Sequence, residues 1–189
     1  SITVAAAAAG KYAAGGTTLL DSDGAGRAAE TATDCATGKT SDAGSAFCGK
    51  IAAGYYGTVG ASSGGAFTAH AGTVTACTTT FSHSSTGSGA ITSAESATTT
   101  TKTACKTAPG YIITSSDGAA DGAITVAAAA AGKKAAGGTA LLDSDGAGRA
   151  AETATDCAAG KYSAAGAASC SNCATGKTSD AGSAFCGKI

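Results

Sequence analysis

The chain has 189 residues and a formal net charge of −1, with 13% charged and 43% hydrophobic residues. Leu, Ile, Val and Phe together number only 19, below the roughly one-fifth of a chain at which globular packing becomes doubtful, so we expect no large hydrophobic core. The near-neutral charge argues against disorder and against nucleic-acid binding, which requires clustered Lys and Arg. The sequence has no apolar run of about eighteen residues, so we expect no membrane span.

Internal repetition dominates the chain. Residues 2–44 align with residues 124–166, and the string CATGKTSDAGSAFCGKI occurs at 35–51 and again at 173–189. The sequence therefore predicts a first cysteine-rich copy at 1–51, a divergent Ser/Thr-rich middle region at 52–122, and a second copy at 123–189 that carries one extra 16-residue module. Because both ends fall in mid-pattern, we expect these residues to be a segment of a longer array.

Secondary structure is weakly signalled along the chain. The alanine runs at 5–9 and 127–131 have the best helix propensity, but each is too short to nucleate a helix alone. A one- or two-turn helix is expected at 26–32, and short strands bounded by Gly, Pro and Ser are expected at 72–81 and 110–114. The predicted fold class is small, disulfide-rich, mainly β and irregular, with tandem cysteine-rich modules in an elongated array.

A four-residue frame, C-x-x-G followed by Lys or Tyr, recurs along the sequence. Three frames begin with cysteine, and four others carry Ala, Ile or Thr in its place. In each frame that begins with cysteine, a second cysteine stands thirteen positions after the first. A disulfide closing such a loop contributes roughly 3 kcal/mol, and small domains short of core commonly rely on disulfides in oxidising compartments. The expected pairs, the last by elimination, are Cys35–Cys48, Cys157–Cys170, Cys173–Cys186 and Cys77–Cys105.

Metal binding is the alternative use of these cysteines. A single C-x-x-C is present, at Cys170 and Cys173, and a structural zinc site needs four ligands in compact spacing. Both histidines, His70 and His83, lie far from it in sequence. The spacing therefore favours disulfides, and we expect no metal there and an extracellular location.

The stretch DCAAGKYSAAGAASCSNCATGKTSDAGSAFC resembles the cysteine-rich repeats called ephrin-receptor-like, which are distant kin of tumour-necrosis-factor-receptor modules. Its setting, low in complexity and rich in Ala, Gly and Thr, is similar to that of the surface immobilisation antigens of ciliates. The match is close over 157–186 and partial over 35–48. The resemblance implies secreted, often membrane-tethered proteins whose rod-like arrays form coats, hairs or adhesive surfaces.

Two motifs suggest ligands. The string LLDSDGAGRAAE, at 19–30 and 141–152, has the alternating Asp-x-Asp-Gly of calcium loops, but alanines stand where an EF-hand-like loop would place its later ligands. A solvated turn is the favoured interpretation. If calcium binds, the candidate ligands are Asp21, Asp23, Asp143 and Asp145. The second motif, GKT, lacks the upstream glycine that a phosphate-binding loop requires.

Residues 73–103 contain eighteen Ser or Thr. Such tracts in secreted proteins are typical carriers of O-linked glycans, and an exposed polar loop is the alternative. The densest run gives the candidate glycosylation sites Thr98, Thr99, Thr100 and Thr101.

No catalytic constellation stands out, because the sequence has neither a nucleophile elbow nor a metal signature. We therefore expect a protein that is not an enzyme and needs no cofactor. The sequence favours a structural extracellular protein, a glycosylated subunit of a surface coat, hair or filament that associates with itself. The alternative is a receptor- or adhesin-type binding ectodomain, with Tyr55, Tyr56 and Phe67 as the local aromatic concentration.

Overall fold

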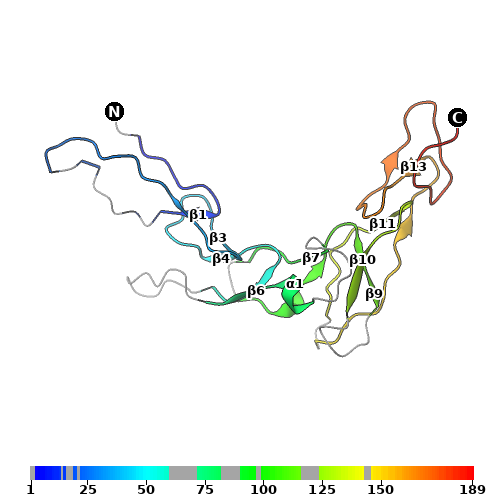
Figure 1. Cartoon of the computed structure of the whole chain (residues 1–189), viewed down its shortest axis with the longest axis horizontal. Coiled ribbons are helices and arrows are strands. Elements are labelled where there is room, and N and C mark those ends of the chain that lie inside the picture. Colours follow the sequence, from blue (N-terminus) through cyan, green and yellow to red (C-terminus); the bar gives the residue numbers. More distant parts are fainter. Residues whose placement is uncertain are drawn as a thin grey trace. The chain divides into compact units, whose positions relative to one another are not determined.

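The structure is a computed structural model of the whole chain (Figure 1). It describes residues 3–13, 15, 19–20, 22–59, 72–81, 90–96, 99–115, 124–142 and 146–189. The chain forms two compact units. The first comprises Ser1–Ala53, Gly57–Val74 and Glu95–Thr100, and the second comprises Gly54–Tyr56, Thr75–Ala94 and Thr101–Ile189.

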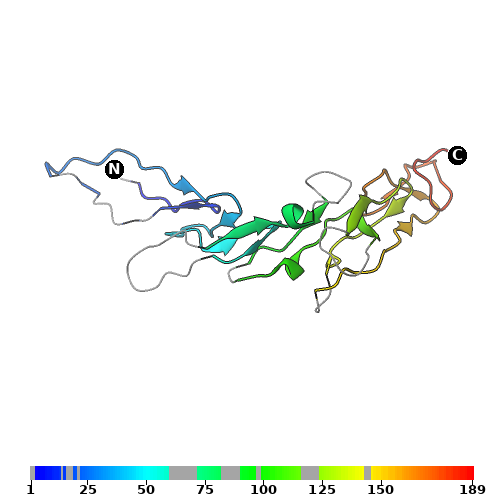
Figure 2. The ribbon, with the colours of Figure 1, turned by 60° about the horizontal axis from the view of Figure 1, so that its bottom comes forward.

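Short antiparallel hairpins make up most of the regular structure (Figure 2). The paired strands are β1 with β2, β3 with β4, β5 with β6, β7 with β8, β9 with β10, β11 with β12, and β13 with β14. Their bounds are β1 Lys11–Tyr12, β2 Thr33–Asp34, β3 Lys39–Thr40, β4 Lys50–Ile51, β5 Tyr55–Gly57, β6 Val74–Ala76, β7 Ile91–Thr92, β8 Lys106–Thr107, β9 Tyr111–Ser115, β10 Thr125–Ala128, β11 Lys133–Lys134, β12 Thr155–Asp156, β13 Lys161–Tyr162 and β14 Ser171–Asn172. Among the described residues, two helical turns accompany them, α1 Cys77–Thr80 and the 3₁₀ turn η1 Lys102–Ala104.

The recurring frame is a tight turn. In the module that begins at Cys157, the Lys161 N–H donates to the Ala158 carbonyl at 3.0 Å, and Gly160 between them has a φ of 78°. A hydrogen-bonded turn with positive φ at its third residue matches a type II turn, which selects glycine there. All seven frame glycines have positive φ, namely Gly10, Gly38, Gly54, Gly110, Gly132, Gly160 and Gly176.

The four disulfides are formed within modules or across the middle region. Cys35–Cys48, Cys157–Cys170 and Cys173–Cys186 each span 13 residues, and Cys77–Cys105 spans 28. In every pair the two Cα atoms lie 5.7 Å apart. Three of these pairs are those expected from the spacing, Cys77–Cys105 is the pair expected by elimination, and the chain has no free cysteine. The fold is therefore disulfide-rich, mainly β and irregular.

The second unit contains a small hydrophobic core. Its ten buried members include both cysteines of the Cys77–Cys105 disulfide and come from the middle region and from the second copy: Cys77, Phe81, Ala90, Ile91, Cys105, Ile113, Ile124, Val126, Leu141 and Leu142. Tyr56 and Tyr111 pack against this cluster from its edge. Burying a Leu or Ile side chain contributes about 1.5–3 kcal/mol, so these few aliphatics supplement the disulfides.

The helix expected at 26–32 is wrong. The Arg27 N–H donates to the Leu19 carbonyl at 3.2 Å, and Gly26 forms a bridge with Leu20, so this segment closes a loop. Residues 27–32 beyond that bridge have no helical turn. The Ala-rich segment leaves the loop in an irregular conformation because the chain must return to pair Thr33 and Asp34 with β1.

The strand expected at 72–81 is only partly correct. β6 ends at Ala76, and the next four residues form α1. The Phe81 N–H donates to the Cys77 carbonyl at 3.0 Å, and both side chains are buried in the core. Packing of Cys77 and Phe81 on the same side of one turn thus overrides the β propensity of the threonines between them. The strand expected at 110–114 is confirmed as β9.

Candidate functional site: the junction between modules

Successive modules meet through one repeated junction. We number a module from the first residue of its frame, so that the frame glycine is position 4 and the following Lys or Tyr is position 5. Four junctions can be compared on this numbering, one in the first unit and three in the second. They join the modules that begin at Ala7 and Cys35, Thr107 and Ala129, Ala129 and Cys157, and Cys157 and Cys173.

Three backbone hydrogen bonds recur at each junction. Between the modules that begin at Ala129 and Cys157, the Cys157 N–H donates to the Gly132 carbonyl, the Gly132 N–H donates to the Ser163 carbonyl, and the Gly166 N–H donates to the Ala129 carbonyl, at 2.8–2.9 Å. The same three bonds, at equivalent positions, form at the other three junctions with distances of 2.8–3.0 Å. Because they use only backbone groups, modules of different sequence can form the same junction.

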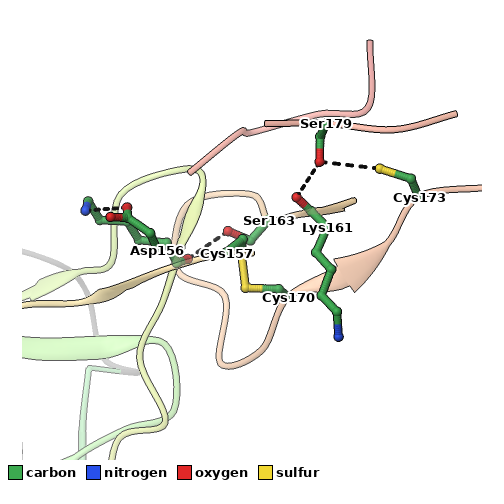
Figure 3. The surroundings of a disulfide bond; sticks show 8 residues. Asp156, Cys157, Lys161, Ser163, Cys170, Cys173 and Ser179 are labelled. Atoms are coloured by element: carbon green, nitrogen blue, oxygen red, sulfur yellow. Dashed lines mark hydrogen bonds and ion pairs between the residues drawn. A yellow bond between two sulfur atoms is a disulfide. The ribbon is translucent and has the colours of Figure 1, made fainter. Parts of the chain in front are cut away.

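A buried serine hydroxyl adds a fourth bond at three junctions. Ser163 Oγ donates to the Lys133 carbonyl and Ser179 Oγ donates to the Lys161 carbonyl, both at 2.7 Å (Figure 3). Ser41 Oγ donates to the Lys11 carbonyl at the same distance. Each of these serines, at position 7, is buried. Position 7 is Ala135 at the remaining junction, so that junction lacks this hydroxyl bond.

The middle region uses the same arrangement with an insertion. Ser93 Oγ donates to the Tyr55 carbonyl at 2.6 Å, the Gly54 N–H donates to the Ser93 carbonyl at 3.2 Å, and the Cys77 N–H donates to the Gly54 carbonyl at 2.9 Å. Positions 1 and 7 of this module are therefore Cys77 and Ser93, separated by a longer stretch of chain. The frame pattern misses this module because the expected glycine does not stand three residues after Cys77.

Charged side chains flank the paired strands of the junction. Lys133 Nζ lies 2.6 Å from Asp156 Oδ1, and Lys11 makes the equivalent pair with Asp34. Asn172 stands at the equivalent position opposite Lys161. These pairs are exposed, and exposed ion pairs contribute only about 0–1 kcal/mol, so they add little to the stability of the junction.

Lys50 lies between two carboxylates in the first unit. Its Nζ contacts Asp42 and lies 3.1 Å from Glu95. The hydrogen bonds that Lys50 Nζ donates to Asp42 and then to Glu95 raise the pKa of Lys50 above its ordinary value, against a smaller opposing effect of burial. Lys188 makes the equivalent contact with Asp180 in the second copy, at 2.6 Å.

Two glycine contacts link modules that are two apart in the chain. A Cβ added to Gly132 would lie 1.9 Å from the Gly182 carbonyl oxygen, and one added to Gly110 would lie 2.0 Å from that of Gly166. Any larger residue would overlap the neighbouring backbone. Glycine is therefore required at these positions both by the turn and by the close approach of another module.

The candidate calcium ligands are described only in part. Asp23 Oδ1 accepts a hydrogen bond from the Ala25 N–H at 3.2 Å, which is the side-chain-to-backbone pattern of an Asx turn. Within the described residues, no group of three His, Cys, Asp or Glu side chains could hold a metal ion. Asp21, Asp143 and Asp145 lie outside the described residues.

The candidate glycosylation sites differ in exposure. Thr99 and Thr101 are exposed, and Thr101 Oγ1 lies 2.7 Å from Thr103 Oγ1. Thr100 is only partly exposed, and within the described structure its hydroxyl oxygen is buried without a hydrogen-bond partner. Thr98 lies outside the described residues. Thr99 and Thr101 are therefore the accessible candidates.

One member of the aromatic concentration, Tyr56, packs against the hydrophobic core. Tyr55 and Tyr56 are half-buried, and the Tyr56 hydroxyl lies 2.5 Å from Thr80 Oγ1. Phe67, His70 and His83 lie outside the described residues. In the described part of the chain, no helix is long and apolar enough to cross a membrane.

Sequence reasoning missed the serines and the second glycine of the junction. Position 7 is serine in all three cysteine frames, and position 10 is glycine in each of them. This fixed offset from the frame was the signal that could have identified them. No protein-family model, curated protein or solved structure matches the chain.

Proposed function

We propose that the chain is a structural extracellular protein built of disulfide-closed modules, and that it serves as a subunit of a surface coat, hair or filament without enzymatic activity. The observation that carries this proposal is the repeated junction, in which four pairs of modules use the same three backbone hydrogen bonds. Because these three bonds join backbone groups, the same junction can be repeated between modules that differ at most other positions. Arrays of this kind suit length and surface coverage, because each module contacts mainly its neighbours.

The disulfides support the extracellular location in this proposal. Eight paired cysteines are typical of secreted or extracellular proteins. The Ser/Thr-rich middle region supports decoration with O-linked glycans at the accessible Thr99 and Thr101. A receptor- or adhesin-type role gains no support from Tyr56, since this side chain packs against the core, and Tyr55 is half-buried.

Immunoelectron microscopy of the native material tests the proposal. An antibody against the repeated string at 35–51 and 173–189 should label a continuous coat or periodic fibres on the cell surface. A matched antibody against residues 52–59 controls for access to the repeated string. Label confined to the cell interior, or to isolated molecules bound to a soluble partner, would contradict the structural role.

A further inference from the structure

A single glutamate bonds both backbone groups at the middle of β9, the longest described strand. The Glu152 N–H donates to the Ile113 carbonyl at 2.8 Å. The Glu152 side chain bonds the same residue, because its Oε2 accepts from the Ile113 N–H at 3.3 Å. Glu152 is half-buried and does not itself belong to a strand. One residue thus takes the place that a third strand would have beside Ile113.

These two groups of Ile113 lie on the outer side of a two-stranded sheet. In the described part of the chain, β9 pairs with β10 alone, and the register sets Ile113 opposite Val126 (Figure 1). Along an antiparallel strand, residues alternate between bonding the partner strand and pointing their N–H and C=O groups away from it. Because Glu152 bonds both groups of Ile113, they point away from β10. We call this side of the strand the β9 outer edge.

The carboxylate is held in place from its other oxygen. Thr139 Oγ1 donates to Glu152 Oε1 at 2.7 Å, while Oε2 bonds the β9 outer edge. The Ile113 side chain is fully buried in the core, so the strand beneath this contact is itself fixed. The side chain of Glu152 therefore supplies two of the three hydrogen bonds that position residue 152. Without it, one backbone bond would remain.

An open β9 outer edge would be suited to pairing with itself. The sequence of β9, Tyr-Ile-Ile-Thr-Ser, has no charged residue, and uncharged segments rich in β-branched and aromatic residues pair readily through open edges. Two antiparallel copies of β9 centred on Ile113 would form a twofold contact. In that contact the two Ile113 residues would exchange both of their N–H···O=C bonds. These are the two groups that Glu152 now bonds.

We propose that Glu152 is an autoinhibitory contact, which closes the β9 outer edge against antiparallel pairing with β9 of a second copy of the chain. Its carboxylate accepts the N–H that a second strand would otherwise use, and it places a charge where that strand would lie. A charged group turned toward a strand edge is one of the devices by which proteins prevent edge pairing. The inference does not depend on the proposed role in a coat or filament, because it concerns an edge that the native chain keeps closed.

Hydrogen exchange at the Ile113 amide tests the inference in the disulfide-intact chain. NMR measures this exchange at ~0.05 mM and ~1 mM protein, and sedimentation velocity gives the mass in the same samples. In the native chain, exchange should not depend on concentration. In Glu152→Ala it should be about threefold slower in the concentrated sample, the fall in monomer expected for a dissociation constant of about 0.1 mM. Thr139→Val, which removes the anchor of the carboxylate, should give the same dimer with weaker affinity.

Two control variants separate this role from a general loss of stability. Glu30→Ala changes the exposed counterpart of Glu152 and should alter neither the mass nor the exchange. Ile91→Val removes one methyl group from the same core, away from β9, and so lowers stability without opening the edge; it should stay monomeric. The proposal would be overturned if Glu152→Ala and Thr139→Val were both monomeric at ~1 mM protein. Dimers that leave the Ile113 amide unprotected would also overturn it, as would equal dimerisation of Ile91→Val.

Discussion

The hydroxyl of Ser163 donates a 2.7 Å hydrogen bond to the backbone carbonyl of Lys133, thirty residues earlier in the chain. Ser163 is buried, and its own carbonyl accepts from Gly132. The same serine-to-carbonyl bond recurs at Ser41 and Ser179. At three of the four junctions, one serine side chain therefore completes a contact that is otherwise made by backbone groups.

Replacing this serine should weaken the junction. Ser163→Ala leaves the part-buried Lys133 carbonyl without its hydroxyl donor, and we expect a loss of about 1–3 kcal/mol in the free energy of unfolding. Urea denaturation of the disulfide-intact chain measures it. Ser171→Ala, at an exposed position in β14, is the control and should change stability by less than about 0.5 kcal/mol. Equal effects of the two substitutions would mean that the hydroxyl bond contributes nothing.

The frame glycines provide a matched comparison. Gly132 and Gly176 have nearly the same φ, 81° and 80°, but an added Cβ would overlap the Gly182 carbonyl only at Gly132. Gly176→Ala should cost about 1–2 kcal/mol, the strain of a left-handed alanine. Gly132→Ala should cost clearly more, because the backbone of another module must also move. Thermal unfolding of the two variants checks the order, and similar melting temperatures would show that the modules are not in close contact.

The leucines of the two copies should respond differently to truncation. Leu141→Ala removes a fully buried side chain from the core, and we expect a loss of about 2–5 kcal/mol. Leu19→Ala, at the equivalent exposed position, should change stability by less than about 0.5 kcal/mol. Chemical denaturation of both variants measures the difference. A large loss at Leu19 in the isolated chain would show that its side chain is covered after all.

The disulfides should differ in how much they contribute to the free energy of unfolding, because they close loops of different length. Removing Cys157–Cys170 as the double alanine variant should cost roughly 3 kcal/mol. Removing Cys77–Cys105, which closes a loop about twice as long, should cost about 0.6 kcal/mol more from chain entropy alone. Its two sulfurs also lie in the hydrophobic core, which increases the difference. Equilibrium unfolding of the two variants gives the comparison, and a smaller loss for Cys77–Cys105 would contradict it.

Lys50 should make stability depend on alkaline pH. Asp42 and Glu95 raise the pKa of Lys50, so the folded state holds this proton more tightly than the unfolded chain. The resulting stabilisation is fully present below the unfolded pKa of about 10.4 and is lost as pH rises through the higher folded value. The stability difference between the native chain and Lys50→Met, measured by urea denaturation, should therefore shrink above about pH 10.4. A difference that stays constant into strong alkali would exclude this linkage.

The sequence alone determined the local features of this protein. The thirteen-residue spacing of cysteines was enough to predict the disulfides, because a cross-link between near neighbours depends little on distant packing. The frame glycines likewise specify their turns through a positive φ that other residues avoid. The helix expected at 26–32 failed because the loop from Leu19 to Arg27 closes and the chain then returns to β1.

Only the tertiary structure decided what became of identical sequences. Thr-Val-Ala-Ala is a strand at 125–128, where β9 lies beside it, and is not a strand at 3–6. The paired leucines that follow are buried in one copy and exposed in the other. A β-strand is completed by hydrogen bonds to another segment, and apolar burial requires a covering surface. Both therefore depend on which residues lie opposite, and a repeated sequence cannot specify that by itself.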